Sequence, residues 1–439
     1  MKILVVGSGG REHAILWALK KTSSRSLDLY CAPGNAGIAQ IARCVSISAT
    51  DISSLAQFAT TESIDFTFVG PEAPLAAGIV DQFERIGLAI AGPSQLASRL
   101  ESSKAFAKDF MTRHAIPTAR YKVAESPTQA LEFLRAGEFG AANSRVVVKA
   151  DGLAAGKGVI VAHSRAEAEK AVTELMSGAL VGGEAARRII IEEALEGREV
   201  SLLLFSDGHD YALMPAARDH KRIGERDTGP NTGGMGAITD ASVLSSETLD
   251  RILREIVEPT LKGAQEEGFP FRGVLFVGLM LTSDGPQVLE YNVRFGDPET
   301  QAILVRLNSD LLEIFAAIAG GRLGATSVDW ASESSACVVL AGRGYPGKYE
   351  TGARIAGLDR ASAASHVEVF HAGTSRSTNG DWLTAGGRVL GVTATGESLD
   401  EALGRCYNAV DKIYWEGVQY RRDIGRFAEA PKPSSARHG

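Results

Sequence analysis

Short apolar runs alternate with amphipathic stretches along the first hundred residues, which predicts parallel strands covered by helices. The pattern places strands at 3–6, 66–69 and 89–91 and a helix at about 12–20. The first strand runs into a glycine-rich turn that contains Gly9 and Gly10. The dinucleotide fingerprint GxGxxG fails there, because Glu12 stands where its third glycine is required. A helix start still favours an anion, so a pyrophosphate, a single phosphate ester and a tight turn without ligand all fit.

Capping residues mark the starts of further helices. The sequence predicts a helix from Ser102 or Ser103 with Lys104 in its first turn, a helix at 164–176 with the capping box Ser164 and Glu167, and a helix from Asn308 or Ser309 to about residue 318.

A short strand at 146–149 ends on Lys149 and leads into the segment ADGLAAGKGV. This segment is not a Walker A loop, because it is one residue short and has Gly158 where a serine or threonine would bind Mg²⁺. Its small residues predict a flexible cover whose backbone approaches phosphates, with Lys149 and Lys157 as point charges. A surface hairpin with solvated lysines fits the same letters.

Acidic residues lie between two predicted strands at 189–193 and 199–205. Glu192, Glu193 and Glu199 could bind the edge of an adenine and ribose hydroxyls, or they could form a polar turn. The segment 219–236 has a basic cluster followed by glycines, and we predict a long loop there. Loops of that length in compact domains tend to be functional.

The segment 288–301 combines a strand with oxygen ligands. A strict period of two predicts one face with Val288, Glu290 and Asn292 and the other with Leu289, Tyr291 and Val293. Side-chain oxygens two residues apart can converge on Mg²⁺, which leaves its other positions to phosphate and water. Arg294 follows as a donor for an anionic group, and the turn at 296–299 ends the strand. A solvated glutamate and a surface arginine are the alternatives.

The composition changes after about residue 329, where strands at 337–340, 367–370 and 386–392 and a helix at 399–414 predict a smaller α+β unit. The tail at 429–439 is expected to be disordered.

The length of 439 residues suggests roughly three domains. A net charge of −7 argues against nucleic-acid binding, and four scattered cysteines lack metal spacing. Met1 leads directly into a strand-like run, which leaves no room for a signal peptide, and no apolar run is long enough to cross a membrane. We therefore expect a cytoplasmic protein.

Nine motifs in order resemble the phosphoribosylamine–glycine ligases of the ATP-grasp superfamily. They are the loop at 7–13, APGNAG from Ala32, VGPEAPL from Val69, SKAFAKDF from Ser103, VKADGLAAGKGV from Val148, DHKR from Asp219, DTGPNTGGMG from Asp227, RFGDPETQ from Arg294 and GGRVL from Gly386. Each motif alone is weak, but their shared order over nearly the whole chain is highly specific.

The resemblance implies an α/β and α+β multidomain protein with a Rossmann-like pre-grasp domain, an ATP-grasp core with a mobile lid and a smaller C-terminal α+β domain. The implied bounds are 1–102 for the pre-grasp domain, 103–120 with 192–328 for the core, 121–191 for the lid and 329–428 for the C-terminal domain.

The resemblance also implies roles for single residues. The catalytic set is Arg294, Lys149, Asp219 and His220, of which His220 is expected to orient groups more than to accept a proton. ATP would contact Lys104, Lys149, Gly152, Gly156, Lys157, Gly158, Glu192, Glu193, Leu195, Glu199 and Lys221. The substrates would contact Gly9, Gly10, Asn35, Pro71, Glu72, Asp219, Asn231, Thr232, Gly233, Gly234, Arg294 and Asp297. Glu290 and Asn292 would hold Mg²⁺ or Mn²⁺, although the preceding strand at 273–282 lacks the third acidic ligand that many ATP-grasp enzymes have.

The implied reaction joins glycine to 5-phosphoribosylamine through a glycyl phosphate, with ATP consumed, in purine biosynthesis. The partners would be small molecules, with no nucleic acid or membrane, and the protein would be a monomer. The alternatives are a nicotinamide oxidoreductase, a nucleotide sensor without catalysis, and an ATP-grasp carboxylase of the biotin or purine type.

Overall fold

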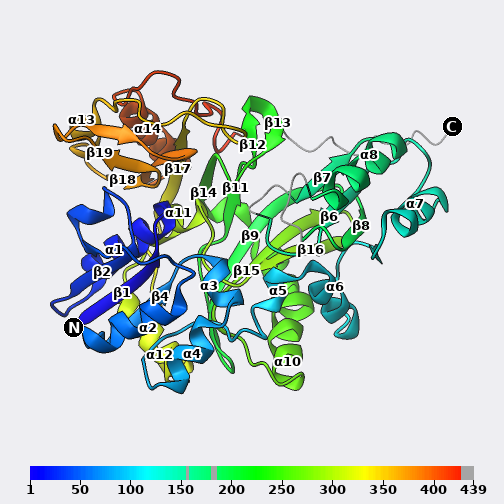
Figure 1. Cartoon of the computed structure of the whole chain (residues 1–439), viewed down its shortest axis with the longest axis horizontal. Helices are drawn as coiled ribbons and strands as arrows, with labels where there is room; N and C mark the ends of the chain where they lie inside the picture. Colours follow the sequence, from blue (N-terminus) through cyan, green and yellow to red (C-terminus); the bar gives the residue numbers. More distant parts are fainter. Residues whose placement is uncertain (155–157, 179–184, 427–439) are drawn as a thin grey trace.

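The computed structural model describes residues 1–154, 158–178 and 185–426 (Figure 1). The N-terminal part is a parallel four-stranded sheet of order β3-β2-β1-β4. Its elements are β1 (Lys2–Gly7), α1 (Gly10–Thr22), β2 (Asp28–Pro33), η1 (Ile38–Gln40), β3 (Arg43–Cys44), α2 (Ile52–Thr61), β4 (Phe66–Val69), α3 (Glu72–Ala76) and α4 (Ile79–Arg85). The predicted alternation is confirmed, except that the strand expected at 89–91 is reduced to one bridge between Thr67 and Ile90.

A nine-stranded sheet forms the centre of the molecule. Its main path has the order β16-β15-β9-β11-β14-β17-β21-β18, with β10 paired to β9, and the pairs are antiparallel. Its strands are β9 (Arg198–Asp207), β10 (Tyr211–Leu213), β11 (Ala217–Asp219), β14 (Gly236–Thr239), β15 (Arg272–Thr282), β16 (Gly285–Asn292), β17 (Ser334–Ala341), β18 (Val367–His371) and β21 (Arg388–Gly396). The strands expected in the C-terminal α+β unit are thus present, and they extend the central sheet.

Helices and short elements surround this sheet. They are α5 (Arg99–Ser102), α6 (Lys104–Arg113), η3 (Ala241–Val243), α9 (Ser246–Ile252), η4 (Leu253–Val257), α10 (Glu258–Glu266), α11 (Glu299–Leu304), α12 (Leu311–Ala319), η5 (Leu323–Ala325), α13 (Leu358–Ser362), β19 (Thr374–Arg376), β20 (Trp382–Thr384) and α14 (Leu399–Val410). Ser103 caps α6 by accepting a hydrogen bond from Phe106 N, as expected. The cap predicted at Asn308 or Ser309 is wrong, because the carboxylate of Asp310 accepts from the first N–H groups of α12.

A separate antiparallel sheet of order β5-β8-β6-β7 lies on the far side of the long central strands from the N-terminal sheet (Figure 1). It consists of β5 (Tyr121–Ala124), β6 (Val146–Ala150), β7 (Val159–Ala162) and β8 (Ile189–Glu193), and α7 (Pro127–Arg135) and α8 (Arg165–Met176) pack on it. Ser164 caps α8 by accepting from Glu167 N, while the Glu167 carboxylate accepts from His163 N. This sheet and its two helices share a hydrophobic core of their own.

The prediction of a long loop at 219–236 is wrong. After β11 the chain forms a small antiparallel ribbon of β12 (Arg222–Gly224) and β13 (Thr228–Asn231), with η2 (Glu225–Asp227) between them, before it enters β14. The sequence did not predict these strands, because they have only three and four residues, are rich in glycine and charge, and are too short to show a period of two.

Within the described residues, no helix is both long enough and apolar enough to cross a bilayer.

Candidate active site

Strand β16 carries the two predicted metal ligands, and a β-bulge sets their direction. Gly278 pairs with Glu290 and Leu279 with Val288, so Leu289 is an extra residue in the ladder. The bulge turns Val288 into the same buried core as Tyr291 and Val293. The prediction that Val288 shares a face with Glu290, and Leu289 with Tyr291, is therefore wrong. Beyond the bulge, Glu290 and Asn292 lie on the face opposite Tyr291 and Val293, as predicted.

The carboxylate of Glu290 is surrounded by cations. Burial, the largest single effect, acts to raise its pKa, but Lys221, Lys149, Lys104 and Arg294 together lower it below the ordinary value. The Glu290 carboxylate is therefore ionised at neutral pH. A Cβ at Gly278 would lie 3.3 Å from Cγ of Glu290, so glycine at this position leaves room for the Glu290 side chain.

These two residues fit a magnesium ion whose shell is completed from outside the protein. Within the described residues, no group of three histidine, cysteine, aspartate or glutamate side chains could hold a metal. One carboxylate and one amide oxygen suit Mg²⁺, which usually keeps waters and substrate phosphates as its other ligands.

Lys149 connects the sheet of order β5-β8-β6-β7, which we call the lid-side sheet, to β16. It is 6% exposed, and its Nζ lies 2.9 Å from Glu192 Oε2 and donates to the carbonyl of Leu289 at 3.2 Å. The carbonyl belongs to the bulge residue, next to Glu290. The structure thus brings together Lys149, Glu192 and Glu290, which are far apart in the sequence.

Lys104 lies at the start of α6 and donates from Nζ to the carbonyl of Gly152 at 2.9 Å. Burial lowers its pKa. Gly152 has φ +122°, and a Cβ there would lie 3.2 Å from Cβ of Ala185. The Lys104 ammonium group therefore lies at the beginning of the glycine-rich segment predicted to cover the phosphates. Gly156 and Lys157 of that segment fall outside the described residues, and Gly158 precedes β7.

The residues predicted to contact adenine and ribose lie at the end of β8, in the connection to β9 and at the start of β9. Glu192 is 2% exposed, and its Oε1 has no hydrogen-bond partner within the described residues. The Glu193 carboxylate accepts from the backbone N–H of Arg120 at 2.9 Å and from Nε of Arg120 at 2.7 Å. Leu195 lies half-buried in the connection, and Glu199 Oε2 is 3.1 Å from Lys221 Nζ. A buried acceptor without a donor is costly, so Glu192 suits a ligand that brings an N–H group.

Arg294 is held by two carboxylates. Its Nη2 lies 2.7 Å from Glu101 Oε1 and its Nε 3.2 Å from Glu72 Oε2. Glu101 also accepts from the backbone N–H of Val293 at 2.7 Å. Glu101 was not predicted, because only the fold brings α5 against the end of β16.

The buried Glu299 and the half-buried Asp219 carry neighbouring carboxyl groups near the turn at 296–299. Burial raises the pKa of Asp219, with Lys221 acting in the opposite direction. Burial, followed by the charge of Asp219, raises the pKa of Glu299 to about 7. Each carboxyl group thus acts to favour the protonated form of the other.

The N-terminal loops meet the C-terminal strands beside this turn. Asn35 donates from Nδ2 to the carbonyls of Ser8 and His371 at 2.8 and 3.0 Å, and its Oδ1 accepts from the N–H groups of Gly37 and Ile38. The Asn35 side-chain amide thus uses both its oxygen and its nitrogen to fix the loop that starts at Ala32. Its role in the structure is to hold the loops around Gly9 together with β18.

Glu12, which breaks the dinucleotide fingerprint, fills the glycine-rich turn. Its Oε2 accepts from Gly9 N at 2.5 Å, and its Oε1 lies 2.7 Å from Arg11 Nε. A Cβ at Gly70, beside the predicted Pro71, would meet Glu12 Oε1 at 1.9 Å. The side chain thus occupies the place where a pyrophosphate would approach the turn; Gly10, the first residue of α1, is buried.

Arg388 of β21 joins the predicted substrate loops. It donates from Nη1 to the carbonyls of Gly233 at 2.5 Å and Asp297 at 2.7 Å, and its Nη2 lies 3.2 Å from Asp297 Oδ2. Tyr345 accepts from Gly233 N at 3.0 Å. Thr232, buried, accepts from Gly234 N at 2.9 Å, and Asn231 ends β13. Arg388 lies in the GGRVL motif, which singled out this residue but did not predict its contacts with the substrate loops.

His220 is 1% exposed, and its contacts are structural. Its Nε2 accepts from Gly425 N at 3.0 Å, and its Nδ1 lies 3.7 Å from Asp227 Oδ1. These contacts fasten the end of β11 to the C-terminal segment, so they support an orienting role and not proton transfer.

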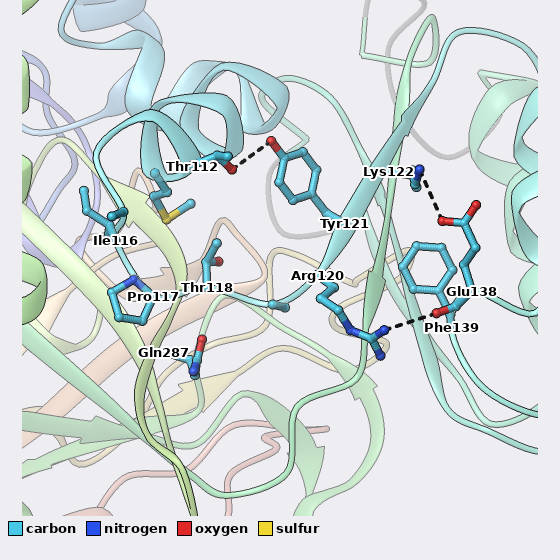
Figure 2. Close-up of a pocket in the computed structure, with 13 residues that line it drawn as sticks. Thr112, Ile116, Pro117, Thr118, Arg120, Tyr121, Lys122, Glu138, Phe139 and Gln287 are labelled. Atoms are coloured by element: carbon cyan, nitrogen blue, oxygen red, sulfur yellow. Dashed lines mark hydrogen bonds and ion pairs between the residues drawn. The ribbon is translucent and has the colours of Figure 1, made fainter.

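A separate cavity of about 650 Å³ lies where α6 passes into β5 (Figure 2). Figure 2 shows Tyr121 directed at Thr112 and Lys122 at Glu138 along its wall. None of the predicted site residues lines it.

Comparisons with known proteins agree with this architecture. Family models described as the N, ATP-grasp (A) and C domains of phosphoribosylglycinamide synthetase match residues 1–101, 102–300 and 335–427. A phosphoribosylamine–glycine ligase of Allochromatium vinosum is 49% identical over 437 residues, which cover 99% of this chain and 100% of that protein.

Solved structures show the same relationship. The phosphoribosylamine–glycine ligase of Thermotoga maritima has a TM-score of 0.81 at 33% identity, over 97% of this chain and 100% of that one. Biotin carboxylase of Campylobacter jejuni, at 17% identity and a TM-score of 0.71 over 95% of this chain and 92% of that one, shares the fold. The predicted ATP-grasp architecture is confirmed, and the chain belongs to the phosphoribosylglycinamide synthetase family.

Proposed function

We propose that this protein joins glycine to 5-phosphoribosylamine and converts ATP to ADP and phosphate, the second step of purine biosynthesis de novo. The similarity to proteins named phosphoribosylamine–glycine ligase, over nearly their full length, supports this reaction. The substrates are small molecules, and we place the enzyme in the cytoplasm as a monomer without nucleic-acid or membrane partners. The domain bounds proposed are 1–102, 103–120 with 192–328, 121–191 and 329–428.

ATP lies between the lid-side sheet and the central sheet in this proposal. Oε1 of Glu192, a buried acceptor, binds the amino group of adenine, with Glu193 and Leu195 beside the ring. Glu199 binds the ribose. Lys149 and Lys104 bind the phosphates as compact charges.

Glu290 and Asn292 hold the divalent cation, Mg²⁺ or Mn²⁺. When bound, such an ion offsets negative charge on the phosphates and fixes their orientation. The lowered pKa of Glu290 keeps its carboxylate charged for this task.

A carboxylate is a poor acyl donor, so glycine must be activated before an amine can attack it. The γ-phosphoryl group is transferred to a carboxylate oxygen of glycine, giving glycyl phosphate and ADP. Arg294, fixed by Glu101 and Glu72, orients the glycine carboxylate and then the departing phosphate. The amine of phosphoribosylamine attacks the carbonyl carbon, phosphate leaves, and the amine loses a proton.

Glycyl phosphate reacts with water, so the site must close during turnover. The lid-side sheet supplies Lys149 and Glu192, and its own hydrophobic core allows it to close over the nucleotide as a unit. The glycines around Gly152, together with Gly156, Lys157 and Gly158, complete the cover in this proposal.

The substrate loops hold phosphoribosylamine. The loops around Gly9, Gly10, Asn35, Pro71, Glu72, Asn231, Thr232, Gly233, Gly234 and Asp297 surround it in this proposal. Asp219 and Glu299 face its amine, and His220 orients β11.

The single observation that carries the proposal is the convergence of Lys149, Glu192 and Glu290 on the bulge of β16. The test is to measure ADP formation with Mg²⁺, ATP, glycine and phosphoribosylamine, and to omit each in turn. We expect ADP only when all are present. Equal turnover with bicarbonate in place of glycine would favour a carboxylase, ATP binding without turnover a sensor, and NADH binding an oxidoreductase.

A further inference from the structure

Lys108 is a buried lysine to which the proposed reaction gives no role. It lies one turn after Lys104 on α6 and is 2% exposed. Its Nζ lies 3.2 Å from Glu192 Oε2 and donates to Thr118 Oγ1 at 2.8 Å. A buried lysine is rare unless it is paired, and here the pair is the carboxylate that we assign to adenine.

Glu192 therefore has two cations on one oxygen. Lys149 and Lys108 lie 2.9 and 3.2 Å from Oε2, while Oε1 has no hydrogen-bond partner within the described residues. The two lysines fix the rotation of the carboxylate, because both attract the same oxygen. Oε1 is consequently held free for a ligand.

The same two lysines attach this carboxylate to the metal-binding strand. Thr118, which accepts from Lys108, donates to the carbonyl of Val288 at 2.7 Å. Lys149 donates to the carbonyl of Leu289 at 3.2 Å. Two consecutive carbonyls at the bulge thus connect Glu192 to the strand that carries Glu290.

We propose that Lys108 is a positioning residue for nucleotide binding, which keeps Oε1 of Glu192 directed at the amino group of a 6-aminopurine and balances its charge when Lys149 engages the phosphates. This inference rests on the proposed function. With Lys108 in place, Lys149 can leave Oε2 without exposing an unpaired buried carboxylate, which is strongly unfavourable. A guanine would place its 6-oxo acceptor against Oε1, so the same geometry selects adenine.

The environment of Lys108 agrees with this role. Burial lowers its pKa to about 8, with the charge of Glu192 acting in the opposite direction and that of Lys149 adding to the decrease. The carboxylate therefore supplies the attraction that keeps Lys108 charged at neutral pH.

The test is calorimetric binding of non-hydrolysable ATP and GTP analogues to the full chain carrying Lys108→Met. We expect affinity for the ATP analogue to fall about 10-fold, as expected for a lost charged hydrogen bond, and the preference over the GTP analogue to decrease. Lys122→Met is the matched control, because Lys122 also lies 3.2 Å from a glutamate, Glu138, but at the surface. Its affinity should not change.

A double-mutant cycle shows whether Lys108 acts through Glu192. In a Glu192→Gln background, Lys108→Met should lose most of its effect. Unchanged affinity and preference in Lys108→Met, or an equal effect in both backgrounds, would overturn the inference. If Lys108→Met does not fold, Thr118→Val removes the hydroxyl that holds Nζ, and unchanged preference there overturns it equally.

The parent chain separates the two hypotheses. Binding needs neither glycine nor phosphoribosylamine, so an enzyme that binds the ATP analogue but forms no product contradicts the proposed function alone. Normal product formation with an unaffected Lys108→Met variant contradicts only the role of Lys108.

Discussion

Replacement of Lys149 by methionine removes the ammonium group that bridges β6, β8 and β16 while it keeps most of the side-chain volume. Glu192 loses the nearer of its two cations, at 2.9 Å, but Lys108 remains at 3.2 Å. Breaking a buried ion pair costs about 3–5 kcal/mol. Because one partner is retained, we expect the free energy of unfolding to fall by only about 2 kcal/mol, which is less than that range.

The catalytic effect of Lys149→Met should be larger than its effect on stability. Loss of one preorganised donor at a developing charge typically costs about 100- to 1,000-fold in kcat. We therefore expect glycine-dependent ADP formation to fall by about 100-fold or more, with the far-ultraviolet circular dichroism unchanged. The assay is coupled ADP release at saturating glycine and phosphoribosylamine.

Lys122→Met is a suitable control here also, because Lys122 pairs with Glu138 at the surface of the same sheet. It should retain normal turnover. Turnover of Lys149→Met within about threefold of the parent chain, a barrier change below about 1 kcal/mol, would refute the assigned role.

Three further changes test other parts of the structure. Gly278→Ala places a Cβ 3.3 Å from Cγ of Glu290, so the Mg²⁺ concentration needed for half-maximal activity should rise while the fold persists. Burial raises the pKa of Glu299 to about 7. The protonated group therefore stabilises the fold fully below about pH 4.5, the usual glutamate value, and this contribution is lost as the pH rises through about 7. Glu299→Gln should flatten the decrease in stability over that pH window. Arg421→Ala removes a buried guanidinium that lies 2.7 Å from both Asp227 and Asp423. Because Asp227 is more than half exposed, this loss should cost about 2 kcal/mol in chemical denaturation.

Each of these changes has a result that contradicts its reasoning. An unchanged Mg²⁺ requirement in Gly278→Ala would separate Glu290 from the metal. An identical pH dependence of stability in Glu299→Gln would show that another group titrates there. A loss below about 0.5 kcal/mol in Arg421→Ala, the range of ordinary surface changes, would mean that its ion pairs contribute little.

Local signals in the sequence were sufficient for much of the fold. The cap at Ser103 depends on a side chain and a backbone N–H three residues apart, and α6 begins where it predicts. The alternation that predicted β1 and β4 depends on burial of whole strands. Such features need no knowledge of the tertiary structure.

The bulge at Leu289 could not be predicted, because it depends on the register between β16 and β15. A period of two counted along the sequence does not include the extra residue of a bulge, so it assigns the residues on one side of the bulge to the wrong face of the sheet. The shared face predicted for Glu290 and Asn292 was correct because both residues follow the bulge.

The residues that hold the site were also missed for a physical reason. Glu101 binds the backbone of Val293, 192 positions later in the sequence, and Lys108 of α6 reaches Glu192 of β8, 84 positions later. Neither residue lies in a pattern that differs from a solvated helix surface. Only their burial against an opposite charge reveals them.

The central claim is that glycine is activated by phosphoryl transfer beside Lys149, Glu192 and Glu290. The most direct test uses glycine labelled with ¹⁸O in both carboxylate oxygens and mass analysis of the released phosphate. Glycyl phosphate passes one carboxylate oxygen to phosphate, so each phosphate should carry one ¹⁸O atom. Phosphate without ¹⁸O, released at the same rate as product, would contradict the account.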